Sequence, residues 1–256
     1  MVSPSATSPD VLLVHGFGTS FESTWRHNGW VDLLSDAGRR VVGVDLLGHG
    51  AAPKPTEPEA YRDLEDRVLD EMPDDPVDAV GFSAGAMALL WLAAHHPHRF
   101  RRIVVSGVGQ NLFPPDPNEG KDGGDADEAG RGAADDRALR IAEAVRTGVA
   151  DDPELRYFAD LPEAGSPQPG SRDREALAAF MTRPDRRRFT AEILARVTAP
   201  VLVVLGDRDF AGPADSLVDA LPDAIFRELR GVDHFATPKH FGFLEAALDF
   251  LDAQAF

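Results

Sequence analysis

The sequence lacks cysteine altogether, and only three of its 26 basic residues are lysine. Without cysteine there are no disulfide bonds, no thiolate nucleophile and no zinc–thiolate site. No apolar run approaches the ~20 residues that span a bilayer. The first ten residues also lack the basic and apolar segments of a secretory signal. We therefore expect a cytoplasmic protein that does not contact membranes.

Positive charge is scarce as well, because 26 Lys and Arg stand against 43 Asp and Glu, a net charge of −17. Such a surface repels phosphate backbones, which argues against a nucleic-acid partner. We expect the acidic surface mainly to keep the protein soluble. The 256 residues, 43% hydrophobic and 27% charged, suit one large globular domain or two small ones.

Short apolar runs bounded by turn residues predict six β-strands, and helix-like stretches follow several of them. The runs are nearly continuous and rich in β-branched residues, which is typical of strands covered on both faces. Strands alternating with helices predict an α/β fold with a mostly parallel sheet flanked by helices. The expected strands are 11–14, 41–44, 77–80, 103–105, 201–205 and 224–229, and the expected helices are 30–37, 61–72, 84–96 and 241–253.

The alternation stops between Gly107 and Ala199, where no strand-like run occurs. Residues 114–136 are rich in Gly, Asp, Glu and Pro and poor in large apolar side chains. Such a composition buries too little area to offset the entropy lost on ordering, so we expect a flexible acidic loop. Short helices are expected at 138–145, 154–161, 174–181 and 187–197. We expect a core domain formed by 1–107 and 199–256, and a helical lid inserted at 108–198.

Gly81–Gly85 forms a G-x-S-x-G pattern centred on Ser83. It lies directly between a predicted strand and a predicted helix, the placement in which this pattern presents a nucleophilic serine. The flanking glycines permit a tight strand-to-helix turn that holds the serine in a strained conformation. The start of the helix offers free backbone N–H groups to a developing oxyanion.

A serine hydroxyl needs a base to act as a nucleophile. His234, in the loop Gly231–Phe235, is the candidate base, because an imidazole can take and return a proton near neutral pH. The turn Gly206–Asp209 offers two carboxylates, Asp207 and Asp209, to orient the imidazole. His240 is the rival base.

Five motifs in this order resemble those of the α/β-hydrolase superfamily, in its serine-nucleophile, esterase-like branch. The resemblance implies that Ser83, Asp209 and His234 form the catalytic triad, with the acid at the fourth position of its turn. It also implies that the backbone N–H groups of Phe17 and Ala84 form the oxyanion hole. The motifs are His15-Gly16-Phe17-Gly18, Asp45-Leu46-Leu47-Gly48-His49-Gly50, Gly81–Gly85, Gly206–Asp209 and Gly231–Phe235.

The chain departs from this family at its start, where the usual pair of leading strands has no counterpart. We therefore expect a sheet of about six strands. Asp45, His15 and His49 are expected to shape turns. No metal ion or organic cofactor is implied.

The expected activity is hydrolysis of carboxylic esters through an acyl-enzyme, as in a carboxylesterase acting on a small-molecule ester or related acyl compound. The same fold also serves as thioesterase, lactonase, perhydrolase or carbon–carbon bond hydrolase, and fold alone does not choose among them. A non-catalytic ligand-binding protein is a further alternative. We expect short to medium acyl chains. The sequence carries no signal for the oligomeric state.

Overall fold

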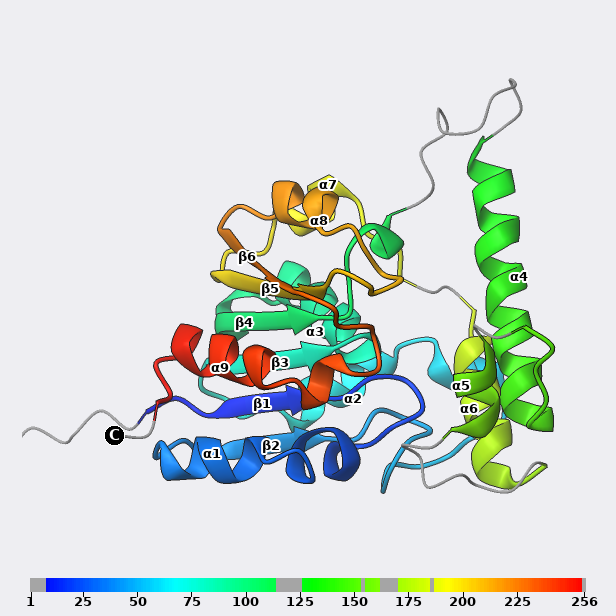
Figure 1. The fold of residues 1–256 in the computed structure, drawn as a ribbon, viewed down its shortest axis with the longest axis horizontal. Coiled ribbons are helices and arrows are strands. Elements are labelled where there is room, and N and C mark those ends of the chain that lie inside the picture. The colour runs from blue at the N-terminus through cyan, green and yellow to red at the C-terminus, as the bar shows by residue number, and fades with distance from the viewer. Residues whose placement is uncertain (1–7, 114–125, 153–154, 162–169, 185–186, 255–256) are drawn as a thin grey trace, which may run out of the picture.

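The structure, a computed structural model, describes residues 8–113, 126–152, 155–161, 170–184 and 187–254, and only the backbone of 126–135. Its centre is a parallel sheet of six strands in the order β2-β1-β3-β4-β5-β6 (Figure 1). The strands are β1 Val11–Val14, β2 Val41–Val44, β3 Val77–Phe82, β4 Phe100–Ser106, β5 Val201–Gly206 and β6 Ala224–Leu229. The predicted six-stranded sheet is therefore confirmed.

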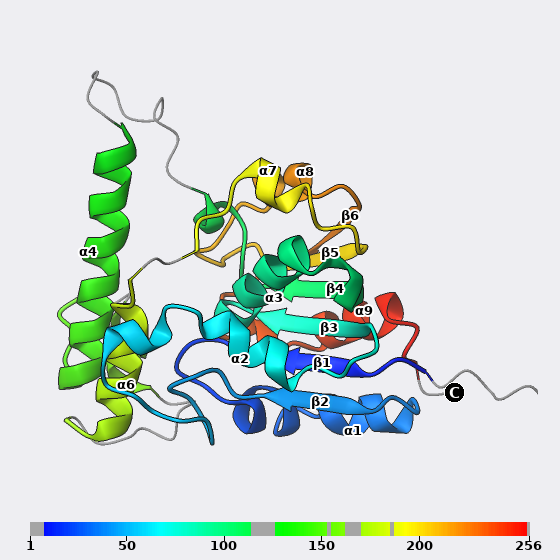
Figure 2. The ribbon, with the colours of Figure 1, turned by 180° about the vertical axis from the view of Figure 1, so that it is seen from behind.

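Helices cover both faces of the sheet, which explains why its central strands β1, β3 and β5 are buried along their length. In β1, Val11 and Leu13 pack in one hydrophobic cluster with side chains of α1 (Trp30–Asp36) and α9 (Phe241–Phe250). Leu12 and Val14 point the other way, into a cluster with side chains of α2 (Leu64–Glu71) and α3 (Ala84–His95). Successive side chains of a strand alternate between faces, so every position of β1 is buried. Figure 1 shows α1 and α9 on the near side, and Figure 2 shows α2 and α3 on the far side.

The helices of this core agree with the expected ones within a few residues, and α8 is an addition. The core helices are α1 Trp30–Asp36, α2 Leu64–Glu71, α3 Ala84–His95, α7 Ala191–Leu194, α8 Asp215–Ala220 and α9 Phe241–Phe250. Short helical turns lie at Glu22–Arg26, Pro58–Tyr61, Pro97–Arg99, Gln110–Leu112 and Thr237–Lys239. Within the described residues, no helix is long and apolar enough to cross a membrane.

Of the four described α-helices between β4 and β5, three stand at the carboxyl ends of the strands (Figure 1), whereas α7 packs on the core, although it lies within the expected lid 108–198. The three are α4 Ala126–Thr147, α5 Arg156–Asp160 and α6 Arg172–Met181. They share a small hydrophobic cluster of their own, which includes Val145, Phe158 and Leu177. The buried guanidinium of Arg174 ties them together, because it donates hydrogen bonds to the carbonyls of Val145 (2.6 Å) and Ala159 (2.7 Å).

The loop expected at 114–136 is only partly testable. Residues 114–125 lie outside the described residues, whereas 126–136 are helical and form the first half of α4. The loop prediction is wrong for this second part. Alanine is frequent there, and alanine is the strongest helix former, which the count of acidic and glycine residues obscured. The division of the chain at 107/108 and 198/199 stays a prediction.

The buried side chain of Arg39 links three segments at the opposite end of the sheet, where the strands begin. Arg39 donates to the carbonyls of Pro9 (2.9 Å) and Leu251 (2.8 Å), and it pairs with the buried carboxylate of Asp78. One side chain thereby joins the segment before β1, the start of β3 and the end of α9. A buried pair of this kind is costly to break, because either partner alone would be an unpaired buried charge.

Candidate active site

Ser83 occupies the turn between β3 and α3 and has φ +51° and ψ −113°. A non-glycine residue at positive φ is strained and persists only where its surroundings enforce it. The surroundings here are backbone contacts. A Cβ on Gly85 would lie 2.3 Å from the Val14 carbonyl oxygen, and one on Gly81 would lie 2.8 Å from Ala86 Cα. Both outer positions of the G-x-S-x-G pattern therefore require glycine, and their close packing holds Ser83 in place.

The structure brings Ser83, His234 and Asp209 together from three separate segments. His234 Nδ1 donates to Asp209 Oδ1 at 2.9 Å, with Oδ2 at 3.1 Å, and His234 Nε2 lies 3.1 Å from Ser83 Oγ. Because Nδ1 carries the donated proton, Nε2 of the neutral ring is an acceptor for the serine hydroxyl. Asp209 and His234 are buried, whereas Ser83 is half-buried. Ser83 is therefore partly open to solvent, while His234 and Asp209 are shielded from it.

The two rival residues make other contacts. Asp207 Oδ1 accepts the backbone N–H of Gly231 at 2.7 Å, so this carboxylate pins the histidine loop rather than the ring. His240 is exposed, and its Nδ1 accepts the N–H of Gly242 at 3.1 Å, at the start of α9. The turn Gly206–Asp209 and the loop Gly231–Phe235 also pack backbone against backbone. A Cβ on Gly206 would lie 2.0 Å from the Val232 carbonyl oxygen.

The His-Gly turn after β1 lies directly against the serine turn. A Cβ on Gly16 would be 3.3 Å from Ser83 Cβ, which places the Gly16–Phe17 peptide beside the serine. His15 fixes this peptide, since its Nδ1 donates to the Gly16 carbonyl at 2.7 Å and its Nε2 accepts the Leu46 N–H at 3.1 Å. The carbonyl and the next N–H point in opposite directions from a trans peptide, so the ring also sets the direction of the Phe17 N–H. Burial lowers the pKa of His15, which keeps the ring neutral.

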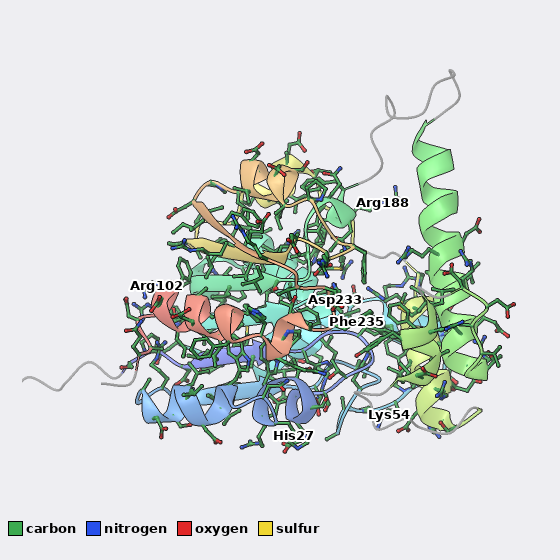
Figure 3. The ribbon with its side chains drawn as sticks, in the orientation of Figure 1. His27, Lys54, Arg102, Arg188, Asp233 and Phe235 are labelled. Carbon is green, nitrogen blue, oxygen red and sulfur yellow. The ribbon has the colours of Figure 1, made fainter. Side chains whose placement is uncertain are left out.

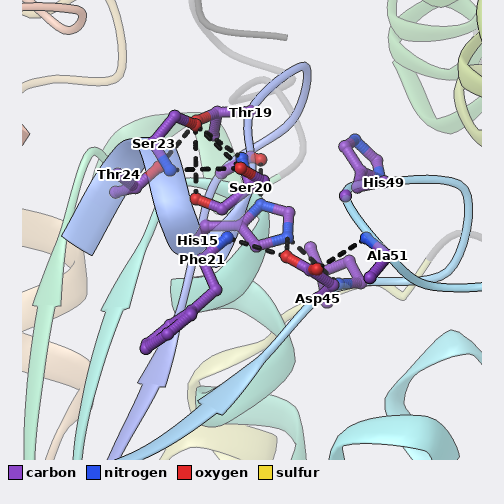
Figure 4. Close-up of polar contacts among 12 residues, drawn as sticks. His15, Thr19, Ser20, Phe21, Ser23, Thr24, Asp45, His49 and Ala51 are labelled. Atoms are coloured by element: carbon purple, nitrogen blue, oxygen red, sulfur yellow. Dashed lines mark hydrogen bonds and ion pairs between the residues drawn. The ribbon is translucent and has the colours of Figure 1, made fainter. Parts of the chain in front are cut away.

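Asp45 organises the loops below this turn (Figure 4). Its carboxylate accepts the backbone N–H groups of Phe21 and Ala51, each at 2.7 Å, and lies 3.5 Å from His15 Nε2. A carboxylate that accepts backbone donors from two loops fixes their relative position. Asp45 therefore contacts loop backbone rather than the His234–Ser83 pair, as expected of a turn residue.

Aromatic rings surround the His234 imidazole. Phe210 stacks on it at 4.2 Å between ring centroids, and Phe82 and Phe235 lie at 4.9 and 5.3 Å. The inserted helices meet these rings from outside, because Tyr157 of α5 stacks on Phe235 at 3.6 Å. Figure 3 shows Phe235 on the side of the sheet that faces the inserted helices.

The Phe17 ring also meets the inserted helices, at 6.0 Å from Phe158 of α5 and 5.4 Å from Phe180 of α6. Core and site aromatics carry the same signal in a sequence, so no pattern distinguishes them. Among the described residues, no group of three or more His, Asp or Glu side chains is arranged to hold a metal ion.

Comparison with known proteins agrees with the fold and the motifs. A family model described as the alpha/beta hydrolase fold matches residues 9–246, and the chain belongs to this family. A pimeloyl-[acyl-carrier protein] methyl ester esterase of Neisseria meningitidis is 31% identical over 215 residues, 79% of this chain and 76% of the relative. The 3-oxoadipate enol-lactonase 2 of Acinetobacter baylyi is 28% identical over 222 residues, 80% of this chain and 73% of the relative.

Among solved structures, a serine hydrolase involved in carbazole degradation (the CarC enzyme) superposes with a TM-score of 0.66 at 23% identity, covering 97% of this chain and 92% of the other. At this identity the superposition establishes the fold alone. The resemblance inferred from the motifs is thus confirmed at the level of the family. The protein is a hydrolase of the α/β-hydrolase family with esterase and enol-lactonase relatives.

Proposed function

We propose that this protein is a serine hydrolase that cleaves carboxylic esters of small molecules through an acyl-enzyme. The observation that carries the proposal is the continuous chain of contacts Ser83 Oγ–His234 Nε2 (3.1 Å) and His234 Nδ1–Asp209 Oδ1 (2.9 Å). In the first half-reaction Ser83 Oγ attacks the ester carbonyl, and His234 takes the hydroxyl proton and delivers it to the departing alcohol. Asp209 holds the imidazole with its proton on Nδ1 and stabilises the imidazolium that forms.

The second half-reaction returns the enzyme to its starting state. His234 takes a proton from water, the hydroxide attacks the acyl carbonyl, and the proton passes back to Ser83 Oγ as the carboxylic acid leaves. The backbone N–H groups of Phe17 and Ala84 hold the oxyanion formed in each half-reaction. The contact of Gly16 with Ser83 supports this role, since it places the Phe17 peptide beside the nucleophile. A donor of this kind contributes about 10²–10³ in rate.

The inserted helices serve as a lid over the site in this proposal, within the predicted insertion 108–198. Their contact with Phe17 and Phe235 supports it, because those two residues adjoin the proposed oxyanion donor and base. The more similar of the two relatives above is a methyl ester esterase, which supports an ester as the substrate. The predicted cytoplasmic location stays a prediction.

Labelling and turnover test the proposal together. A fluorophosphonate probe is expected to label the wild type and Ser35→Ala, which removes an exposed serine of α1, and to leave Ser83→Ala unlabelled. Ser83→Ala and His234→Ala should each lower kcat/KM for p-nitrophenyl esters by about 10³-fold or more, with unchanged thermal unfolding.

Thioester and lactone substrates run in parallel decide the reaction class. A folded wild type that is neither labelled nor active on any of these substrates would instead be the non-catalytic binding protein.

A further inference from the structure

His49 carries a polar atom that neither the fold nor the proposed reaction uses. The side chain is buried, with 2% of its surface exposed, and its Nδ1 donates to the Leu47 carbonyl at 3.0 Å. That bond leaves Nε2 as a lone-pair acceptor, and within the described part of the chain it has no hydrogen-bond partner. A buried polar atom without a partner is rare in a folded protein and points to an occupant that comes from outside the chain.

The position of the ring indicates which occupant. The His49 ring packs edge-on against Phe17, with centroids 5.5 Å apart, and against Phe180 of α6 at 5.1 Å. Phe17 supplies a proposed oxyanion donor, and Phe180 belongs to the inserted helices. His49 therefore lies between the residue of the proposed oxyanion donor and the inserted helices, so the occupant to consider is a bound substrate. In Figure 4 the ring stands apart from the Asp45 contacts.

The charge state of His49 restricts the occupant further. Burial lowers the pKa of His49 to about 3, and the positive charges of Arg183 and Lys54 act in the same direction. The ring is consequently neutral near pH 7, and Nε2 accepts a hydrogen bond but cannot donate one. An ether or ester oxygen, which is only an acceptor, finds no partner there.

We propose that His49 Nε2 accepts a hydrogen bond from a hydroxyl or amide N–H group on the chain of the ester substrate, several bonds from the reacting carbonyl. This inference rests on the proposed ester hydrolysis and specifies the class of ester. A purely aliphatic chain leaves Nε2 unpaired or bridged by a water molecule. A donor-bearing chain satisfies it, and a site built to bond such a group discriminates strongly against analogues that lack it.

Matched esters test the proposal on the wild-type enzyme. The series consists of p-nitrophenyl esters of ω-hydroxy, ω-acetamido, ω-methoxy and unsubstituted acids, with chains from butanoate to octanoate. At one or more chain lengths, the hydroxy or acetamido ester should exceed the methoxy ester in kcat/KM by about tenfold or more. The methoxy esters control for polarity, since they carry an oxygen but no donor. Equal values for hydroxy and methoxy esters at every length would overturn the proposal and leave water as the occupant.

Variants of His49 assign the effect to this atom. His49→Phe keeps an aromatic ring beside Phe17 and Phe180 but removes the acceptor, and it should abolish the preference for donor-bearing esters. His49→Gln restores an acceptor and should retain part of that preference. Phe180→Leu is the matched control, because it alters the same packing without touching a polar atom, so all esters should change alike. A preference that survives His49→Phe would overturn the proposal.

Two further results are also decisive. If His49→Phe does not fold, the wild-type ester series and His49→Gln still decide the outcome. If the folded wild type hydrolyses no ester, the proposed function fails. The site is then judged by calorimetric titration with ω-hydroxyhexanoate and ω-methoxyhexanoate, where equal affinities refute it.

Discussion

The carboxyl ends of the strands and the inserted helices meet at the same site but are held by different means. The turns that carry Ser83 and Asp209 are fixed by backbone packed on backbone, as Gly85 and Gly206 illustrate with room for no Cβ. Among the described residues, the inserted helices contact the site through side chains, such as Tyr157 on Phe235 and Phe180 on Phe17. Backbone packing tolerates little change, whereas ring contacts can be exchanged without moving the chain. The difference suits a fixed reaction combined with an adjustable choice of substrate.

The largest effect is expected where backbone packing is disturbed. In Gly85→Ala the new Cβ would meet the Val14 carbonyl oxygen at 2.3 Å and the His15 oxygen at 2.6 Å, neither of which can rotate away. We expect a loss of about 3 kcal/mol in the free energy of unfolding, from denaturant titration. We also expect a fall of about 10²-fold in kcat/KM from displacement of Ser83.

Gly29→Ala is the matched control, because it has open space around it and only a φ of +81° to oppose the substitution. A cost of about 1 kcal/mol is expected there, with no change in kcat. If the two substitutions lowered kcat equally, close backbone packing at Gly85 would not be what holds Ser83 in place.

A smaller and more local effect is expected in the insertion. Arg174→Met removes the hydrogen bonds to Val145 and Ala159 that tie the inserted helices together. Loss of these charged bonds should cost about 2–3 kcal/mol of local stability. Hydrogen exchange should accelerate in α4, α5 and α6 and stay unchanged in β3 and β5, while KM rises more than kcat falls.

Arg140→Met provides the comparison, since it removes an exposed pair with Asp152 and should change local stability by less than about 1 kcal/mol. Faster exchange in β3 as well as in the helices after Arg174→Met would indicate that the two regions unfold as one.

The smallest effect is a dependence of the free energy of unfolding on pH. It arises at His49, where the sheet turns meet the inserted helices. Burial lowers the pKa of His49 from 6.5 to about 3, so between these values the unfolded chain binds a proton that the folded protein does not. Stability therefore falls as pH drops below about 6.5, by about 2 kcal/mol at pH 5. Burial lowers the pKa of His15 as well, which acts in the same direction.

Urea denaturation at pH 7 and pH 5 measures this loss, and it should be smaller in His49→Phe than in the wild type. Identical pH dependence of the two proteins would show that His49 is protonated as readily in the folded state as in the unfolded chain.

The sequence predicts the sheet and the turns at the carboxyl ends of its strands far better than it predicts the insertion. A glycine required by a close approach or a tight turn leaves a fixed pattern, as at Gly81, Gly85 and Gly206. Central strands buried on both faces, such as β3 and β5, likewise leave continuous apolar runs, whereas the edge strand β6 is mostly exposed and leaves a weaker one. The choice between Asp207 and Asp209 is different, since the family motif favoured Asp209 before the geometry placed it against His234.

The insertion leaves no comparable pattern. Residues 126–136 look like a loop by charge and glycine content, yet their backbone continues the α4 helix. Phe158 and Phe180 meet Phe17 through the three-dimensional packing of α5 and α6, which spacing in the sequence does not encode. The sequence also does not predict the unpartnered Nε2 of His49, because the ring is buried in part by Phe180 of α6.

The hydrogen bonds of Arg39 determine where the protein can be attached to a surface or to another protein. Because one guanidinium holds both Pro9 and Leu251, the two ends of the described chain emerge together at the amino ends of the strands (Figure 1). Ser83 follows the carboxyl end of β3, at the other end of the sheet. A chain anchored to a bead or fused to a carrier next to Pro9 or Leu251 would thus present Ser83, the proposed nucleophile, outward. We also expect a circularly permuted chain, joined between these two positions by a short linker, to fold.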